Sequence, residues 1–217
     1  SVGGKVAIDL PGGKNLAGAF YQPKGVFIDP DLLDTLPTRY VHDGLAEALK
    51  YGCIGDPELF ELLENIGSEE DLRNHMEEII LRSVLQKKKF VEEDRYDNGS
   101  RQMLNFGHTI GHAIERYFNY STYTHGEGVA IGMCLLTEQT ERLGITEKGT
   151  AERVIRAVHH LSLPTSIAVP ALELIPQIMH DKKRRGGEIT LVVLDKIGKA
   201  HLLKVKTSEL DKYIVTE

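Results

Sequence analysis

The feature that most constrains the fold is a succession of helix-spaced apolar stripes that begins near residue 38 and continues through most of the chain. Apolar residues three or four positions apart share one face of an α-helix, and that face needs a partner that buries it. The stripes predict helices over residues 38–52, 57–63, 101–118, 126–143, 146–163 and 171–180, and a long helix from 69 to the break at 96–100. The sequence therefore predicts a mainly α, multi-helical domain.

Residues at the ends of these stripes are typical helix signals. Thr38 and Asp56 stand where a helix cap is needed, and Asp56 is followed by a proline that suits the first helical position. Ser68 with Asp71 resembles a capping box before the long helix. Gly144 ends the helix over 126–143.

Little of the chain has the pattern of β-strands. Two runs rich in β-formers, 189–194 and 201–205, are separated by a turn-like stretch and predict a small C-terminal β-hairpin, with a last short helix over 208–213. Residues 26–29 are a candidate for one further short strand. Residues 1–25 are rich in Gly and Lys and are interpreted as a binding loop with short extended pieces, so we expect a loop segment over 1–25 and a helical domain over 26–217.

Composition narrows the class of protein. Of the 217 residues, 41% are hydrophobic and 27% are charged, which is ordinary for a globular domain. A net charge of -6 argues against broad binding to nucleic acid or to acidic membranes. The sequence has no apolar run of roughly 20 residues, and Cys53 and Cys134 lack metal or disulfide spacing, so we expect a cytoplasmic protein with both cysteines in the core.

The densest group of chemically useful residues lies between residues 105 and 127. On a helix, Asn105, His108, His112 and Glu115 would project from one face, and His125 lies at the head of the next predicted helix. Three imidazoles in this arrangement suit a divalent metal, but they could also satisfy one another and core carbonyl groups. Gly107 and Gly111 beside them indicate close approach of a neighbouring helix or a ligand.

Other charged residues allow two interpretations. Glu47 could be an intrahelical partner of Lys50, or an anionic third metal ligand. The lysines of the opening segment and the runs at 87–89 and 181–185 could be solvated faces. With Arg101 and Asn15, they also suit a small substrate that carries a phosphate and a carboxylate.

These residues belong to a series of motifs that resembles a known family. Ser-Val-Gly-Gly-Lys, Gly-Lys-Asn, Gly-Leu-Ala-Glu-x-x-Lys-Tyr-Gly, Leu-Asn-Phe-Gly-His-Thr-x-Gly-His-Ala-Ile-Glu, His-Gly-Glu and Asp-Lys-Lys occur in this order. Together they resemble the second half of 3-dehydroquinate synthases, in the sugar phosphate cyclase family. The resemblance covers nearly the whole chain. It implies that an N-terminal α/β dinucleotide-binding domain, absent from this chain, is the partner needed for turnover, and that the isolated chain is inactive.

The resemblance also implies a reaction and a site. The family converts a seven-carbon keto acid phosphate, DAHP, to 3-dehydroquinate and phosphate in the shikimate pathway, with transient oxidation by NAD and a bound Zn²⁺ or Co²⁺. The resemblance implies that Glu47, His108 and His125 bind the metal and that His112 and Lys50 act in catalysis. Substrate binding would fall to Asn15, Lys87, Arg101, Asn105, Lys182 and Lys183, and contact with NAD to Lys5, Lys14, Leu32, Leu33, Asp34 and Thr35. The family is typically a homodimer.

One loop departs from the family pattern. Residues 94–97 read Asp-Arg-Tyr-Asp where the family commonly has Asp-Glu-x-Glu, so no role is carried over to this loop. Sibling cyclases that make an inosose or a valiolone, a related metal-dependent polyol dehydrogenase, and a non-catalytic helical binding module are the competing hypotheses. Asn105, His112 and the pair of Lys87 and Arg101 favour a 3-dehydroquinate synthase. The sibling substrates lack the carboxylate that Lys87 and Arg101 would bind.

Overall fold

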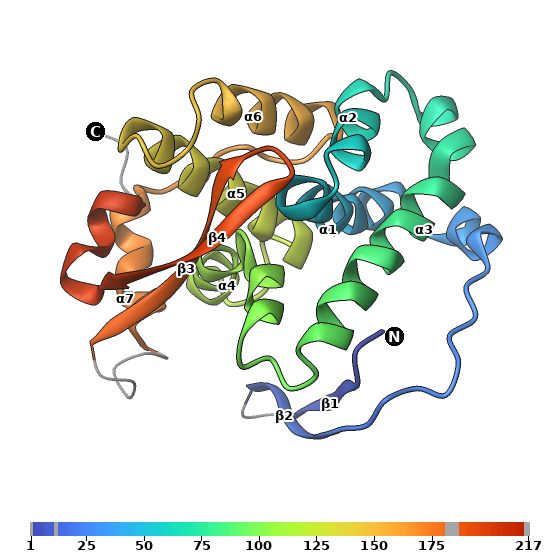
Figure 1. The fold of residues 1–217 in the computed structure, drawn as a ribbon, viewed down its shortest axis with the longest axis horizontal. Coiled ribbons are helices and arrows are strands. Elements are labelled where there is room, and N and C mark those ends of the chain that lie inside the picture. The colour runs from blue at the N-terminus through green and yellow to red at the C-terminus, as the bar shows by residue number, and fades with distance from the viewer. Residues whose placement is uncertain (1, 11–12, 181–186, 215–217) are drawn as a thin grey trace.

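The computed structural model describes residues 2–10, 13–180 and 187–214, and its helices gather around one central helix, α5 (His125–Arg142) (Figure 1). Almost every side chain from Gly126 to Leu136 in α5 is buried. A helix that is apolar on all sides is stable only inside a protein, and α5 contacts α1, α4 and α6. The predicted mainly helical fold with a small C-terminal hairpin is confirmed. None of the described helices is long and apolar enough to cross a membrane.

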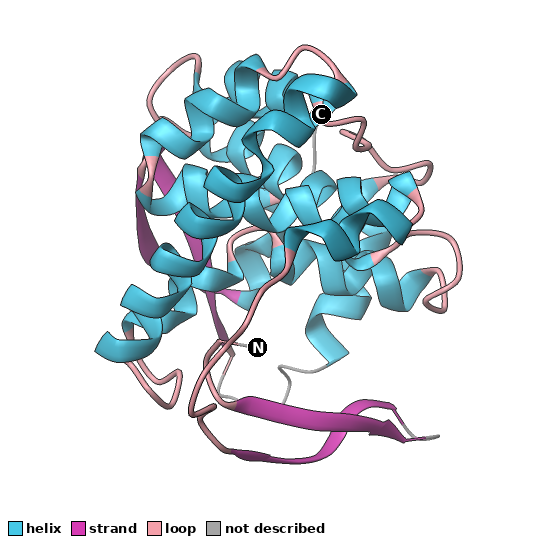
Figure 2. Ribbon diagram, turned by 90° about the vertical axis from the view of Figure 1, so that its right-hand side faces the viewer, coloured by secondary structure: helices cyan, strands magenta, loops and turns pink. Residues whose placement is uncertain are grey.

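The N-terminal residues form a hairpin rather than a loop with extended pieces. Strands β1 (Lys5–Leu10) and β2 (Gly13–Phe20) pair antiparallel, with Lys5 opposite Phe20. Figure 2 shows this hairpin at one side of the helical body. The predicted strand over 26–29 is wrong: these residues pair with no described strand, and Phe27 is 99% exposed. A β-rich run without a neighbouring strand has no partner for its backbone groups.

The predicted caps of α2 (Pro57–Asn65) and α3 (Glu69–Glu93) are confirmed. In α2, Asp56 Oδ1 accepts a hydrogen bond from the backbone N–H of Leu59 at 3.1 Å. In α3, Ser68 Oγ accepts one from Asp71 at 3.1 Å.

The predicted start of α1 (Thr38–Gly55) is confirmed, but its predicted cap and its predicted end are wrong. Thr38 is the first helical residue and not the cap, which is Pro37. The helix continues past Gly52, because the backbone of Phe60 packs 2.8 Å from where a Cβ at Gly52 would lie. This glycine therefore permits close packing of α2 and does not end the helix.

The predicted helix over 101–118 is interrupted. It consists of the 3-10 helix η2 (Ser100–Asn105) and α4 (His108–Tyr117), joined through Gly107 with a φ of 76°. Asn105 is therefore not on the helical face that carries His108 and His112. Glycine adopts this left-handed conformation without strain, and a Cβ there would also lie 2.6 Å from the carbonyl oxygen of Val129.

The C-terminal elements contribute the remaining residues of the hydrophobic core. Helix α6 (Thr150–His160) begins later than predicted, because Thr146 instead donates a hydrogen bond to the carbonyl oxygen of Leu194 at 2.7 Å. The remaining elements agree in position with the predictions and are η3 (Ala171–Leu174), α7 (Ile175–His180), β3 (Glu188–Lys196), β4 (Lys199–Lys206) and η4 (Thr207–Tyr213). Strands β3 and β4 pair antiparallel. Cys53 and Cys134 are buried and free, as expected.

Helices α4 and α5 cross at glycines. A Cβ on Gly132 would overlap the carbonyl oxygen of Gly107, and one on Gly111 would lie 3.0 Å from the backbone of Gly128. The close approach that Gly107 and Gly111 predicted is thus made by a neighbouring helix. The crossing holds the start of α4, where His108 lies, against α5.

We expect Gly132→Ala to lower the free energy of unfolding by about 3 kcal/mol, because the added methyl group meets a backbone atom that cannot move alone. Gly44→Ala is the matched control in α1, where nothing lies within 4 Å of the new Cβ. There the better helix propensity of alanine should add up to about 1 kcal/mol. Urea unfolding of both variants measures the difference, and equal stabilities would show that the crossing tolerates a side chain.

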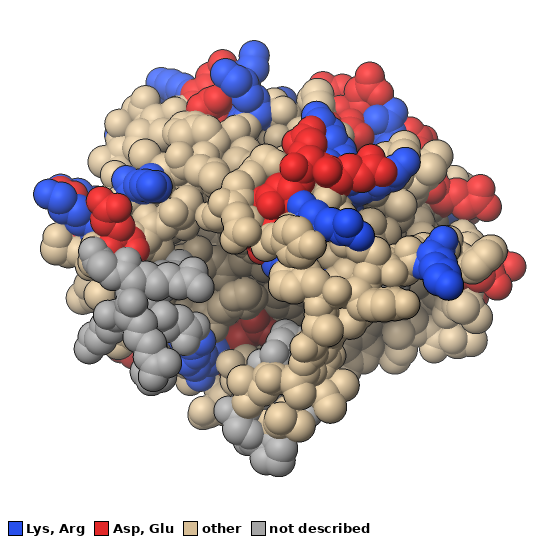
Figure 3. Space-filling model, turned by 60° about the horizontal axis from the view of Figure 1, so that its bottom comes forward, with Lys and Arg blue, Asp and Glu red and all other residues tan. Residues whose placement is uncertain are grey.

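On the face shown in Figure 3, basic and acidic side chains are interspersed over the upper part, and the surface is hollowed near its centre. This is the side of the molecule on which the N-terminal hairpin lies.

Candidate metal and substrate site

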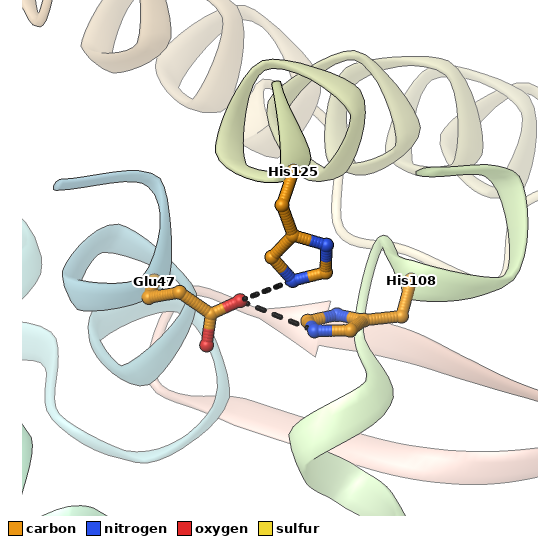
Figure 4. A group of neighbouring side chains, drawn as sticks. All are labelled: Glu47, His108 and His125. Carbon is orange, nitrogen blue, oxygen red and sulfur yellow. Dashed lines mark ion pairs between the residues drawn. The ribbon is translucent and has the colours of Figure 1, made fainter. Parts of the chain in front are cut away.

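Three side chains from three helices meet at one point. Glu47 comes from the middle of α1, and His108 and His125 are the first residues of α4 and α5. Glu47 Oε1 lies 3.1 Å from His108 Nε2 and 3.5 Å from His125 Nε2 (Figure 4). Their candidate ligand atoms all lie within 4.8 Å of one another. One carboxylate and two imidazoles are a common ligand set for a catalytic divalent metal, which keeps a further position open.

The Nδ1 atom of each imidazole faces an oxygen atom that can orient the ring. His108 Nδ1 lies 3.0 Å from the carbonyl oxygen of Phe106, and His125 Nδ1 lies 3.3 Å from the buried carboxylate of Glu115. When Nδ1 donates to these acceptors, the lone pair of Nε2 points into the cluster. Metal-binding histidines are usually oriented in this way.

The carboxylate of Glu47 also fits a cation. Its Oε2 accepts a hydrogen bond from Lys50 Nζ at 2.6 Å, whereas its Oε1 is buried and has no hydrogen-bond partner in the described structure. Burial alone would raise the pKa of Glu47, but contacts with His108, His125 and Lys50 outweigh it and lower the pKa. An ionised oxygen that faces two imidazole nitrogens is a place for a positive charge.

Without a metal, a proton on His125 can supply part of the positive charge next to Glu47. The carboxylates of Glu115 and Glu47 raise the pKa of His125 to about 9, against the opposing effect of burial. Burial lowers the pKa of Lys50, which is only 2% exposed, although the contact with Glu47 opposes this shift. A divalent cation would displace the proton from His125, as metal binding to histidine generally does.

Two cavities adjoin the cluster. The smaller, about 210 Å³, is lined by residues that include Lys5, Lys50, Lys87 and Arg101. The larger, about 490 Å³, lies between η2, α4, α7 and the C-terminal hairpin and is lined by His112, among others. Asn105, His108 and Asp97 line both, and Glu47 lines the smaller, so two of the three candidate metal ligands lie where the two cavities meet.

Arg101 is buried in the wall of the smaller cavity, with 4% of its surface exposed. Its Nη1 donates to the carbonyl oxygen of Arg95 at 3.0 Å and its Nη2 to that of Gly3 at 2.8 Å. These bonds use two of the five guanidinium N–H groups and fix the plane of the others. With Lys50 and Lys87 on the same cavity, the arrangement provides positive charge for an anionic group.

The structure brings most of the predicted site residues together, but not all. The predicted residues that line the cavities or belong to the candidate metal site are Lys5, Glu47, Lys50, Lys87, Arg101, Asn105, His108, His112 and His125. Leu32, Leu33, Asp34 and Thr35 form the 3-10 helix η1 (Pro30–Thr35) and line neither cavity. The side chains of Lys14 and Asn15, and all of Lys182 and Lys183, lie outside the part of the chain that the structure describes.

Two acidic residues of the site were not among the predicted site residues. Glu115 orients His125; its position three residues after His112 on one helix was the only signal in the sequence. Asp97 forms an ion pair with Lys5 and lines both cavities, and its Oδ1 is buried without a hydrogen-bond partner. Its backbone has a φ of 62°, which no local pattern in the loop indicated.

Known proteins share both the sequence and the fold. Residues 44–184 match the family described as 3-dehydroquinate synthase C-terminal, and residues 1–43 match 3-dehydroquinate synthase N-terminal. The 3-dehydroquinate synthase of Clostridium acetobutylicum is 50% identical over 99% of this chain and 60% of its own length. That of Enterococcus faecalis is 43% identical over 100% of this chain and 61% of its own length. The chain thus spans about three fifths of these relatives.

Two solved structures of sugar phosphate cyclases share the fold of this chain. A 2-epi-5-epi-valiolone synthase from Streptomyces hygroscopicus, with NAD⁺ and Zn²⁺ bound, has a TM-score of 0.84 at 26% identity, over 97% of this chain and 60% of its own. A 2-deoxy-scyllo-inosose synthase in complex with carbaglucose-6-phosphate, NAD⁺ and Co²⁺ has a TM-score of 0.79 at 24% identity, over 95% of this chain and 61% of its own, and shows the shared fold.

The fold of this chain is shared with a sugar phosphate cyclase. Within that class, the chain belongs to the 3-dehydroquinate synthase family and contains its C-terminal domain. The two family models meet between residues 43 and 44, inside α1, and the domain boundary expected after residue 25 stays a prediction.

Proposed function

We propose that this chain supplies the metal- and substrate-binding part of a 3-dehydroquinate synthase, which converts DAHP to 3-dehydroquinate and phosphate. The observation that carries the proposal is the cluster of Glu47, His108 and His125 beside a cavity lined by Lys87 and Arg101. The 42–50% identity to 3-dehydroquinate synthases over nearly the whole chain supports this reaction.

Zn²⁺ or Co²⁺ is the proposed metal, with Glu47, His108 and His125 as its ligands. The unpartnered Oε1 of Glu47 and the two oriented imidazoles support this assignment. Such a metal supplies a Lewis acid for the substrate hydroxyl that is oxidised. NAD is the proposed hydride carrier, in contact with Lys5, Lys14 and residues 32–35.

The chain's own residues bind and orient the substrate. Arg101 and Lys87 bind its carboxylate, because a fixed guanidinium offers paired N–H groups and a lysine adds charge. Lys50, whose ammonium is held by Glu47, donates to a ring hydroxyl. Asn105 and His112, together with Asn15 and Lys182 or Lys183, bind the phosphate. Holding both anionic ends places the reacting carbons beside the metal cluster.

His112 is the proposed group for proton transfer. It is an exposed imidazole in the wall of the larger cavity, and its ring centroid lies 5.5 Å from that of His108. An imidazole can accept and return a proton near neutral pH. From this position His112 can exchange a proton at the phosphate end of the substrate, whereas the hydroxyl that is oxidised would lie at the metal.

The test is phosphate release from DAHP with and without NAD, measured for this chain joined to a nucleotide-binding half of the family, called the full-length protein below, and for the 217-residue polypeptide alone. We expect NAD-dependent release by the full-length protein and none by the polypeptide, because hydride transfer requires the nucleotide to be held against the substrate. Light scattering of the full-length protein tests the proposed homodimer. A full-length protein that cyclises a sugar phosphate without a carboxylate, and not DAHP, would support a sibling cyclase instead.

A further inference from the structure

Asp43 joins the helices that carry two of the proposed metal ligands. It lies on α1 one turn before Glu47, and its Oδ1 accepts hydrogen bonds from the backbone N–H groups of Gly126 at 2.6 Å and Glu127 at 3.3 Å. These N–H groups belong to the first turn of α5, immediately after His125. The first N–H groups of a helix have no partner within it, so α1 caps α5 through Asp43.

The two backbones also touch at this point. A Cβ on Gly126 would overlap the carbonyl oxygen of Asp43, so only glycine permits this approach. The negative charge of Asp43 lies at the positive end of the α5 dipole, which adds to the attraction. The separation between α1 and the start of α5 is therefore set by direct contact.

A second tie lies one turn earlier on α1. Arg39 donates to both carboxylate oxygens of Glu127, from Nε and from Nη2, each at 2.8 Å. The same Glu127 accepts a hydrogen bond from the backbone N–H of Thr124 at 3.0 Å, which fixes the residue before His125. Arg39, Asp43 and Glu47 are each four residues apart and so lie on one face of α1. All three face the start of α5.

We propose that Asp43 is a positioning residue that fixes His125 relative to Glu47 and so sets the affinity and geometry of the metal site. This inference rests on the proposed function in taking Glu47 and His125 as metal ligands. His125 is the first residue of α5, next to the two N–H groups that Asp43 binds. A shift of α5 along α1 would change the distance between the two ligand atoms, now 3.5 Å.

The test compares three variants by Co²⁺ titration, with visible absorption as the readout, at a temperature where far-UV circular dichroism shows each to be folded. We expect Asp43→Ala to weaken Co²⁺ binding by about 10- to 100-fold, as loss of a residue that orients a ligand usually does. Asp43→Asn should stay within about threefold of the parent, because its amide oxygen still accepts both N–H groups. Ser68→Ala removes the cap of α3, away from the cluster, and should leave binding unchanged.

Unchanged affinity and spectrum in Asp43→Ala would overturn the inference and leave Asp43 as a helix cap alone. A parent that binds no Co²⁺ would instead contradict the proposed function. A metal-free readout separates the two outcomes: the ¹⁵N resonances of the His125 ring should shift in Asp43→Ala and not in Ser68→Ala. Unshifted resonances in Asp43→Ala would overturn the positioning role whether or not metal binds.

Discussion

His108→Ala will leave the protein with less than about a tenth of the metal that the parent carries, which should be close to one equivalent of zinc or cobalt per chain. The variant removes one of the three proposed ligands and leaves Glu47 and His125 unable to hold the cation between them. The affinity for the metal should fall by more than the 10- to 100-fold that is typical when only an orienting residue is removed. Elemental analysis of protein purified without chelators and desalted before measurement gives the result.

His159→Ala is the matched control, because it removes an exposed imidazole near the end of α6, outside both cavities. It should retain the metal content of the parent. Equal metal in the His108 and His159 variants would show that the metal is bound elsewhere or adventitiously. Glu47→Gln extends the test, since it keeps the shape of the side chain and removes the charge that attracts the cation.

Arg101→Lys will bind DAHP, or an unreactive analogue of it, about 30- to 1000-fold more weakly than the parent full-length protein does. This corresponds to about 2–4 kcal/mol, the range for losing charge-assisted hydrogen bonds to a carboxylate. Lysine keeps the charge but not the paired N–H geometry. An analogue without the carboxylate should bind both proteins to within about threefold, and calorimetry of the four pairs measures the difference.

Lys88→Ala is the control for general loss of positive charge. Lys88 is exposed on α3 next to Lys87 but lies outside the cavity, in an ion pair with Glu92 at 3.7 Å. It should leave the binding of DAHP unchanged. If Arg101→Lys weakens the binding of DAHP and of the analogue without the carboxylate equally, Arg101 is only a structural residue that binds the carbonyl groups of Gly3 and Arg95. A parent that prefers the analogue without the carboxylate would favour a sibling cyclase.

Local chemistry predicted much of the fold. The caps at Asp56 and Ser68 were correct because each depends on a few neighbouring residues. The errors arose where a contact distant in sequence decides the outcome. Thr146 binds the carbonyl oxygen of Leu194 instead of starting a helix.

Two glycines explain other errors. Gly107 leaves the helical conformation where Val129 packs against it, and Gly52 stays within α1 because Phe60 packs on it. In both places the partner lies on another helix. The spacing of apolar residues along one segment does not encode that partner.

Local spacing predicted the candidate metal site only in part. Helical periodicity paired His108 with His112, whereas the structure groups His108 with Glu47 and His125. His112 instead lines the larger cavity and belongs to a second group with Glu115 and His125. The three proposed ligands come from three helices, and packing of α1 and α4 on α5 brings them together. The resemblance to known enzymes identified them, and spacing alone could not.

The central claim, that Glu47, His108 and His125 hold one divalent metal, is tested most directly by anomalous diffraction from crystals grown with zinc, with data collected just above and just below the zinc absorption edge. The account predicts a single strong difference peak between Glu47 Oε1, His108 Nε2 and His125 Nε2. A cluster without a peak, in crystals where zinc is bound at another position, would contradict it.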